Sequence, residues 1–262
     1  MWLTQSFSKD PTLLELSTPL YIVGDLHGQL ADLLEIFREV GWPNKNRKFL
    51  FLGDYVDRTQ MGTETFALIS LLKLLMPDSV YMIRGNHEDI LVNKDYNFSE
   101  ELYTKYDDKH ARSILNSFSN QYKKMSLTAL LDDCVLCMHG GISEKLTSIN
   151  QLRRMEKMDK AEDGTLQADL LWADPHDSVI EWNKSPRNIS QVFNQDALKR
   201  CCEMLGVEMI LRAHEVVQNG CESFGDEKLL WTIFSAGNYT GRCNNLAAVA
   251  AGALREARGA SR

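Results

Sequence analysis

The sequence predicts an α/β fold in which helices cover a β-sheet. Apolar runs of about four to six residues recur along the chain, as in strands that are buried on both faces of a sheet. Two amphipathic helical patterns separate the first three runs, so the order is strand, helix, strand, helix, strand. This alternation is typical of a sheet covered by helices.

Six apolar runs are the expected strands, and each leads into glycine, aspartate, asparagine or histidine. They are Leu20–Val23, Phe49–Leu52, Val80–Ile83, Cys134–Met138, Glu208–Leu211 and Leu229–Phe234. Gln29–Val40 and Thr63–Leu75 carry apolar side chains along one stripe, the spacing of a helix that packs on a sheet. Thr63 is the expected N-cap of the second helix. The polar stretch Ser99–Met125 is also expected to be helical.

The composition fits a compact globular chain. With 262 residues and 44% hydrophobic content, the chain is long enough to bury a sizeable core. The charged share of 25% is ordinary and does not indicate disorder. A net charge of -7 argues against nucleic acid and anionic membranes as partners. No apolar run reaches the length of about 18 residues that a membrane-spanning helix needs.

The cysteines favour a reducing location over a disulfide framework. Cys134 and Cys137 have C-x-x-C spacing, but they lie inside an apolar run. We therefore interpret them as strand residues and not as a redox pair. The start of the chain lacks the pattern of a secretory signal. We expect an intracellular protein, located in the cytoplasm, the nucleus or both.

Metal-ligand types of side chain follow five of the expected strands. In open α/β sheets, ligands bind beyond the carboxyl ends of the strands. One histidine after an apolar run is usually a turn or core residue, but five such endings at one edge are hard to obtain by chance. Oxygen and imidazole donors without thiolates suit Fe, Mn or Zn in an open catalytic site. Two ions that share one aspartate fit the six candidate ligands Asp25, His27, Asp54, Asn86, His139 and His214.

Several ordered motifs resemble the signature of the phosphoprotein phosphatases, the family of protein phosphatase 1, protein phosphatase 2A and calcineurin. The motifs are Gly24-Asp-Leu-His-Gly28, Gly53-Asp-Tyr-Val-Asp-Arg58, Arg84-Gly-Asn-His-Glu88, His139-Gly-Gly141 and Arg212-Ala-His-Glu215, with further blocks at Leu170–Pro175 and Phe234–Tyr239. The resemblance runs from Leu13 to Asn245 and is closest to the phosphatase 1 branch. It implies a calcineurin-like metallophosphoesterase fold, with central β-sandwich-like mixed sheets flanked by helices. It also implies a single catalytic domain over residues 1–245, followed by a divergent alanine-rich tail at 246–262.

The resemblance implies a serine/threonine protein phosphatase with two metal ions, Mn²⁺ or an Fe/Zn pair. Asp25, His27 and Asp54 would hold the first ion. Asp54 would also bridge to the second ion, which Asn86, His139 and His214 would hold. A hydroxide that bridges the ions would attack phosphorus directly. The chain has no Cys-x5-Arg phosphatase loop, so nothing supports a cysteinyl-phosphate route.

The resemblance also assigns the residues around the phosphate. His87 would be the general acid for the leaving serine or threonine oxygen, and Asp57 would orient it. Arg58 and Arg187 would bind the phosphate, a role that suits the planar guanidinium fork. The remaining implied roles are those of two tyrosines near the substrate and one aspartate that supports the site, namely Tyr96, Tyr239 and Asp174.

Four departures from the family pattern are visible. Thr59 replaces a glycine, so it would be strained, and could shift Arg58, if the position requires a positive φ. Gly237 replaces a proline, which should loosen its loop. Thr240 replaces a cysteine, so an electrophilic toxin could not bond covalently there. Leu246–Ala257 has better helix than strand propensity, where relatives continue into sheet strands. The end of this tail is expected to fray.

The departures bear on partners. Phosphoproteins are the expected substrates, and relatives of the phosphatase 1 branch recruit regulatory subunits through short hydrophobic peptides at a sheet edge. The corresponding side chains here are small or polar, at Ala250–Ala257 and at Ser223. Such side chains cannot bury the area that anchors an aromatic hot spot. We therefore expect this docking groove to be degraded.

Two other functions remain open from the sequence. The first is another metallophosphoesterase, acting on dinucleoside polyphosphates or diesters, against which the blocks at Leu170 and Phe234 argue. The second is a weakly active scaffold that uses the metals for folding. Thr59 and the altered tail are its only support.

Overall fold

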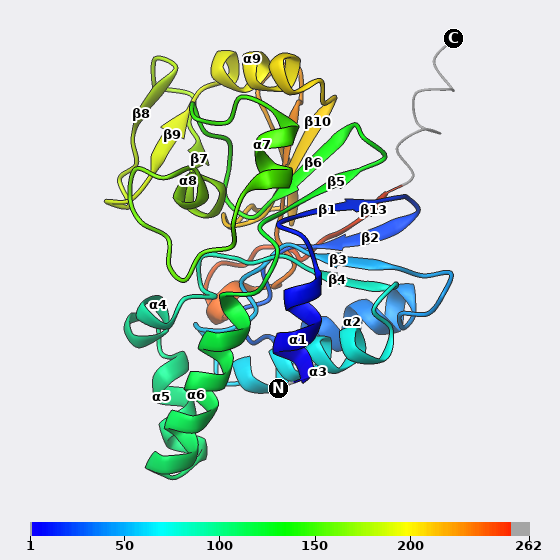
Figure 1. Cartoon of the computed structure of the whole chain (residues 1–262), viewed down its shortest axis with the longest axis vertical. Coiled ribbons are helices and arrows are strands. Elements are labelled where there is room, and N and C mark those ends of the chain that lie inside the picture. The colour runs from blue at the N-terminus through cyan, green and yellow to red at the C-terminus, as the bar shows by residue number, and fades with distance from the viewer. Residues whose placement is uncertain (1, 253–262) are drawn as a thin grey trace.

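The structure is a computed structural model, and it describes residues 2–252. Two sheets lie face to face in the middle of the molecule, and helices cover both outer faces (Figure 1). The layers are therefore helix, sheet, sheet and helix. This arrangement confirms the α/β fold with central β-sandwich-like mixed sheets.

The four-stranded sheet has the order β13-β2-β3-β4, in which β2, β3 and β4 are parallel and β13 is antiparallel. Its strands are β2 (Leu20–Val23), β3 (Phe49–Phe51), β4 (Val80–Met82) and β13 (Val249–Gly252). Successive side chains of a strand point to opposite faces. In β3, Phe49 and Phe51 therefore pack among the helices, whereas Leu50 packs between the sheets.

The six-stranded sheet is mixed and has the order β1-β5-β6-β10-β12-β11. Its strands are β1 (Leu13–Leu16), β5 (Thr128–Leu131), β6 (Val135–Met138), β10 (Met209–Arg212), β11 (Cys221–Phe224) and β12 (Leu230–Ile233). Val135 and Cys137 of β6 face the inner layer, and Leu136 and Met138 face the outer helices. Continuous apolar runs are needed because both faces of each sheet are covered.

The helices divide between the two outer layers. The layer on the four-stranded sheet contains α1 (Trp2–Lys9), α2 (Leu30–Val40), α3 (Gly62–Leu75), α4 (Ile90–Asp95), α5 (Phe98–Lys105) and α6 (Asp108–Tyr122). The other layer contains α7 (Ile149–Arg154), α8 (Leu166–Trp172) and α9 (Gln195–Leu205). Three further short strands form a small sheet of their own beside α8 and α9, namely β7 (Asp174–Pro175), β8 (Trp182–Lys184) and β9 (Gln191–Phe193) (Figure 1).

The structure confirms the six expected strands and the expected helices, but it corrects the start of α3. The N-cap of α3 is Met61, not Thr63, and no side chain of that residue caps the helix. Glu101 of α5 caps it instead, because its carboxylate accepts hydrogen bonds from Gly62 N and Thr63 N, each 2.9 Å long. A carboxylate at a helix N-terminus is stabilising.

The expectation of a helical tail was wrong for Val249–Gly252. These residues form β13 and pair with Tyr21, Ile22 and the rest of β2. Backbone hydrogen bonds to an open sheet edge outweigh the weak helix preference of alanine, because tertiary context overrides propensity. The expected fraying falls on residues 253–262, which lie outside the described residues. The domain boundary at 245 stays a prediction.

Within residues 2–252, no helix combines the length and the apolar character that crossing a membrane requires.

Candidate metal centre and substrate cavity

The carboxyl ends of strands from both sheets meet at one place. Asp25 and His27 follow β2, Asp54 follows β3, and Asn86 follows β4 of the four-stranded sheet. From the six-stranded sheet, His139 follows β6 and His214 follows β10. An isolated bridge between Asp25 and Phe234 joins the sheets at this end. All six predicted ligands are buried, although they are polar or charged.

The backbone at the ligands is constrained. His27, Asp54 and His214 have positive φ angles of 44°, 55° and 75°. Such conformations are uncommon for residues other than glycine and cluster at functional sites. Gly53 has a φ of 108°, and a Cβ there would lie 2.4 Å from the Gly85 backbone nitrogen. Only glycine therefore lets the loops after β3 and β4 approach each other this closely.

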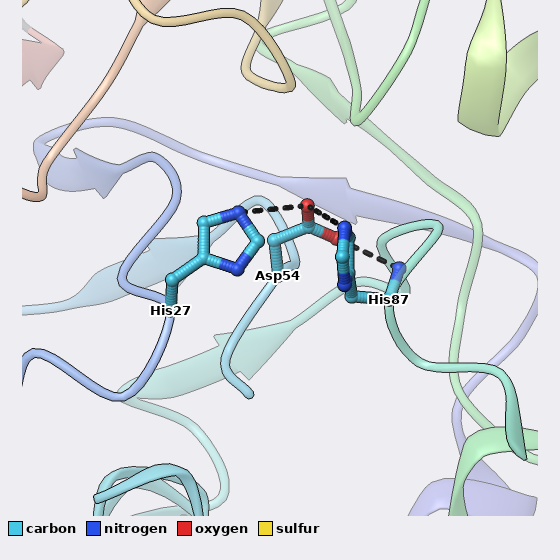
Figure 2. A group of neighbouring side chains, drawn as sticks. All are labelled: His27, Asp54 and His87. Atoms are coloured by element: carbon cyan, nitrogen blue, oxygen red, sulfur yellow. Dashed lines mark hydrogen bonds and ion pairs between the residues drawn. The ribbon is translucent and has the colours of Figure 1, made fainter. Parts of the chain in front are cut away.

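The first cluster is formed by Asp25, His27 and Asp54. His27 Nε2 lies 3.5 Å from Asp25 Oδ2 and 3.3 Å from Asp54 Oδ2, and Figure 2 shows the contact with Asp54. His27 Nδ1 lies 2.8 Å from the Val56 carbonyl oxygen, so it donates the ring proton there. That donation leaves the Nε2 lone pair of the neutral ring facing the carboxylates, as a metal ligand requires.

The second cluster is formed by Asp54, Asn86, His139 and His214. His139 Nε2 lies 3.3 Å from Asp54 Oδ1, 2.7 Å from Asn86 Oδ1 and 3.2 Å from His214 Nδ1. His139 Nδ1 donates to the Leu52 carbonyl oxygen at 2.9 Å, which leaves Nε2 with a lone pair. Four acceptor atoms therefore face one another, and the amide oxygen of Asn86 faces only acceptors. A cation between these atoms would satisfy all of them.

Electrostatics points to the same demand for positive charge in both clusters. Burial lowers the pKa of His27, but interaction with Asp25 and the charge of Asp54 outweigh it and raise the pKa to about 9. Burial also lowers the pKa of His139, but the charge of Asp54 raises it above its ordinary value. The carboxylates of both clusters thus favour a positive charge at these positions. The donor set fits divalent ions, because Asp54 presents one carboxylate oxygen to each cluster.

His87 lies beside the first cluster, and its ring is hydrogen-bonded to Asp57. His87 Nδ1 lies 2.7 Å from Asp57 Oδ2. His87 Nε2 lies 4.0 Å from Asp54 Oδ2, and Figure 2 shows these two side chains. Asp57 is fixed in turn by Asn93 Nδ2 at 2.8 Å and by the Phe98 amide at 2.7 Å. Its buried carboxylate therefore fixes the orientation of the His87 ring.

A cavity of about 250 Å³ opens over the two clusters. Five of the six predicted metal ligands line it, all except His139. The four residues predicted to contact substrate or phosphate line it too, namely Arg58, Tyr96, Arg187 and Tyr239. The Arg58 guanidinium lies 4.0 Å from the centroid of the Tyr96 ring, a cation–π contact. The Tyr239 ring lies 5.2 Å from the His27 ring. Asp57 and His139 lie buried beneath the cavity wall.

Comparisons with known proteins show the family of the chain. The sequence profile of the calcineurin-like phosphoesterases matches residues 18–218. The chain belongs to this family. It is also 40% identical over 242 residues to the serine/threonine-protein phosphatase PP1-delta of Caenorhabditis elegans, covering 92% of this chain and 78% of that protein.

Solved structures show the same fold for this phosphoesterase. A serine/threonine phosphatase from Saccharomyces cerevisiae, with similarity to human phosphatase PP5, superimposes with a TM-score of 0.87 at 31% identity, over 94% of this chain and 78% of that chain. A cold-active protein-tyrosine phosphatase of Shewanella has a TM-score of 0.61 at 15% identity, over 93% of this chain and 78% of that chain. The second likeness shows the fold alone.

Behind the cavity of the phosphoesterase, Asp174 joins two arginines. Arg187 Nε donates to Asp174 Oδ2 at 2.6 Å, and Arg212 Nη2 donates to Asp174 Oδ1 at 2.9 Å. Arg212 is fully buried and also donates to Glu215 at 2.7 Å. The structure thus places Asp174 behind both the cavity and His214, whose Nε2 lies 3.8 Å away.

Sequence reasoning gave no role to Glu88 or Asn93, although both are buried. Glu88 accepts hydrogen bonds from three backbone amides, those of Asp54 at 2.8 Å, Tyr55 at 3.0 Å and Gly85 at 2.8 Å. It therefore ties the loops after β3 and β4 together. The only signal for Glu88 was its place in the motif Arg84–Glu88, and Asn93 carried no signal of its own.

The expectation of strain at Thr59 is not met. The positive φ angles lie at Asp57 and Arg58, at 68° and 72°, and Thr59 is not among the residues with positive φ. Thr59 Oγ1 instead donates to the His27 carbonyl oxygen at 2.7 Å. Threonine therefore fits its position and ties the Arg58 loop to the His27 loop.

The loop at Gly237 is not left loose. Gly237 N donates to Asp32 Oδ2 at 3.1 Å, and the Gly237 carbonyl oxygen accepts from Gln29 Nε2 at 2.8 Å. Proline could not make the first of these bonds, because it has no N–H. The extra freedom of glycine is therefore offset by a contact with α2.

Proposed function

We propose that this chain is a metal-dependent protein phosphatase that hydrolyses phosphoserine and phosphothreonine side chains. The position of Asp54 carries the proposal, because its two carboxylate oxygens face two separate clusters of metal-ligand side chains. The likeness to PP1-delta and to the yeast serine/threonine phosphatase supports this substrate class.

The two clusters would hold two ions, with Asp54 shared. Asp25, His27 and Asp54 would hold one ion, and the second ligand set is Asp54, Asn86, His139 and His214. Mn²⁺ or an Fe/Zn pair suits these oxygen and imidazole donors. A bound pair would supply a nucleophilic water at neutral pH and would neutralise charge on the phosphoryl oxygens.

Arg58 and Arg187 are placed to bind the phosphate. The Arg58 side chain stacks on Tyr96, and among residues 2–252 no hydrogen-bond acceptor occupies its guanidinium. Arg187 uses Nε for Asp174, which leaves both Nη groups without a hydrogen bond to any described residue. Planar guanidinium donors of this kind suit the tetrahedral oxygens of a phosphate that enters the cavity.

His87 would give a proton to the departing serine or threonine oxygen. Asp57 accepts the Nδ1–H, so in the protonated ring Nε2–H is the proton available at the cavity. His87 also lies within reach of the cluster of His27 and Asp54, so a ligand role is the alternative. Replacing a general acid should leave both metal ions bound, whereas replacing a metal ligand should weaken metal binding.

The two alternative functions, another metallophosphoesterase and a weakly active scaffold, have less support from the structure than from the sequence alone. Thr59 makes a hydrogen bond, and its φ angle is not positive, so it gives no reason to expect a damaged site. The altered tail forms β13, which pairs with β2, so it gives little support to a weakly active scaffold. The likeness to serine/threonine phosphatases covers 92% of the chain, including the blocks at Leu170 and Phe234.

A substrate panel with added Mn²⁺ tests the proposal. Matched peptides that carry phosphoserine, phosphothreonine or phosphotyrosine would be compared with a dinucleoside tetraphosphate and an aryl phosphodiester. We expect turnover of the phosphoserine and phosphothreonine peptides to exceed that of all other substrates. Preferred hydrolysis of the dinucleotide or the diester would reject a protein phosphatase.

Two further proposals concern the setting of the enzyme. Phosphoproteins would be its substrates, and regulatory subunits would bind elsewhere than in the usual hydrophobic docking groove. A location in the cytoplasm or nucleus is also proposed, on the ground that the pattern of cysteines in the sequence suits a reducing compartment. Imaging of the tagged chain in its own cells, with cells that express the untagged chain as the control, tests the location.

A further inference from the structure

The loop that carries Tyr239 has a strained backbone. Asn238 and Thr240, on either side of Tyr239, have positive φ angles of 39° and 55°. Conformations of this kind persist in residues other than glycine only where the surroundings hold them. The loop places the Tyr239 ring 5.2 Å from the His27 ring and 5.1 Å from the Phe234 ring. Some contact outside the loop must therefore hold Tyr239 at the cavity.

Two side chains at the N-terminal end of α2 supply this contact. Gln29 donates from Nε2 to the Gly237 carbonyl oxygen at 2.8 Å, and its Oε1 accepts from Thr240 N at 3.3 Å. Asp32 Oδ2 accepts from Gly237 N at 3.1 Å. Gln29 Nε2 also donates to Asp32 Oδ2 at 2.5 Å, so the two side chains brace each other. We call Gln29 and Asp32 the loop clamp.

The loop clamp binds the backbone on both sides of Tyr239, at Gly237 and at Thr240. A separate set of bonds holds the base of the loop, where Asn245 accepts from Tyr239 N at 2.9 Å and from Asn238 N at 2.8 Å. Loss of the clamp therefore leaves the loop attached but free to change the position of the ring. Gln29 also lies two residues after His27, so the clamp joins the metal cluster to the cavity rim.

We propose that Gln29 and Asp32 are positioning residues that hold Tyr239 over the substrate cavity. The proposal rests on the proposed function, because it treats Tyr239 as a substrate contact. Glycine at 237 is part of the device, since the clamp uses an N–H that proline lacks. Loss of the clamp should weaken binding of the peptide part of a substrate more than it slows the chemistry at phosphorus.

The matched pair Gly237→Pro and Gly237→Ala tests the clamp in the full Mn²⁺-loaded chain. Proline removes the donor to Asp32, whereas alanine keeps it, and a Cβ at this position meets nothing closer than 3.6 Å. Gln29→Ala removes the other bonds. We expect Gln29→Ala and Gly237→Pro to raise KM for a phosphoserine peptide about tenfold and about threefold, the range for loss of one or two hydrogen bonds. Gly237→Ala should match the natural chain.

Two readouts separate positioning from general damage. The kcat on a small aryl phosphate should stay within about twofold, because that substrate has no peptide to position. Exchange of the Thr240 amide with solvent should accelerate about tenfold in Gln29→Ala, because its acceptor, Gln29 Oε1, is lost. Unchanged KM and unchanged exchange in both Gln29→Ala and Gly237→Pro would overturn the proposal. Equal effects of Gly237→Ala and Gly237→Pro would overturn the role of the N–H.

The measurements distinguish a variant that does not fold, and a wrong proposed function, from a loop clamp that has no effect. If Gln29→Ala does not fold, Asp32→Ala is measured with the same readouts. If the natural chain turns over no phosphoserine peptide, the proposed function fails. Amide exchange still decides whether the clamp holds the loop, since it requires no turnover.

Discussion

The ligand clusters and the cavity rim are built in different ways. In the clusters, main-chain carbonyl oxygens fix the rings of His27 and His139. His27 Nδ1 donates to the Val56 carbonyl oxygen, and His139 Nδ1 donates to the Leu52 carbonyl oxygen. The rim residues Arg58 and Arg187 are exposed. Within residues 2–252, side chains alone contact their guanidinium groups, Tyr96 at Arg58 and Asp174 at Arg187. Rigid, buried positions suit ligands that must meet at fixed distances, whereas the rim must admit a peptide. Changes in the clusters should therefore abolish function, and changes at the rim should reduce it in steps.

The largest effect is expected for Asp54→Ala. The shared carboxylate serves both clusters, so its removal should lower kcat/KM for a phosphoserine peptide by at least about 10⁴-fold, because two ions each contribute several kcal/mol. Asp177→Ala, at an exposed aspartate, is the matched control and should retain full activity. Activity of Asp54→Ala within about tenfold of the natural chain would contradict the shared site.

His87→Asn should come next. Loss of general acid catalysis is expected to reduce turnover of the phosphoserine peptide by about 10²–10⁴-fold. The loss should shrink for an aryl phosphate, whose leaving group needs little protonation, and both metals should remain bound. The control is His176→Asn, at an exposed histidine. Equal losses on both substrates, or loss of an ion, would instead assign His87 to the metal centre.

Arg187→Lys tests the rim. Lysine is a point charge and cannot reproduce the guanidinium fork, one arm of which Asp174 holds at 2.6 Å. We expect KM for the phosphoserine peptide to rise about tenfold while both metals are retained. Arg153→Lys keeps an exposed ion pair with Glu15 and should be indistinguishable from the natural chain. A KM for Arg187→Lys that equals the control would remove Arg187 from the phosphate site.

The smallest effect concerns the edge strands β11 and β13. Ser223 is exposed on β11, and β13 consists of Val249, two alanines and Gly252. We expect these side chains to bury too little area to hold an aromatic anchor, which in a hot spot is worth about 2 kcal/mol or more. A labelled hydrophobic docking peptide titrated against this chain should show no binding at micromolar concentrations. A phosphatase 1 control should bind it, and micromolar binding to this chain would refute the degraded groove.

Sequence patterns were sufficient for the strands and for the gathering of the ligands. Period and run length mark a buried strand, and parallel strands deliver their carboxyl-end residues to one edge. The division into two sheets followed from the family resemblance and not from the pattern, because a strand buried on both faces reads the same in either sheet.

Contacts between distant segments were not predictable in the same way. Glu101 caps α3 from α5, and Asn93 fixes Asp57 from α4, yet no local pattern marks either contact. β13 forms from an alanine-rich segment because β2 offers it an edge. The sequence shows that threonine stands at position 59, but not which backbone conformation it adopts. The effect of Thr59 depends on its hydrogen bond to the His27 carbonyl oxygen.

The metal content of the natural chain and of Asp54→Ala tests the central claim most directly. Elemental analysis of the purified active protein should find two metal ions per chain, and the same analysis of Asp54→Ala should find none, because one carboxylate serves both clusters. About one ion or none in the active natural chain would contradict the two-metal centre. Loss of only one ion in Asp54→Ala would contradict the shared carboxylate.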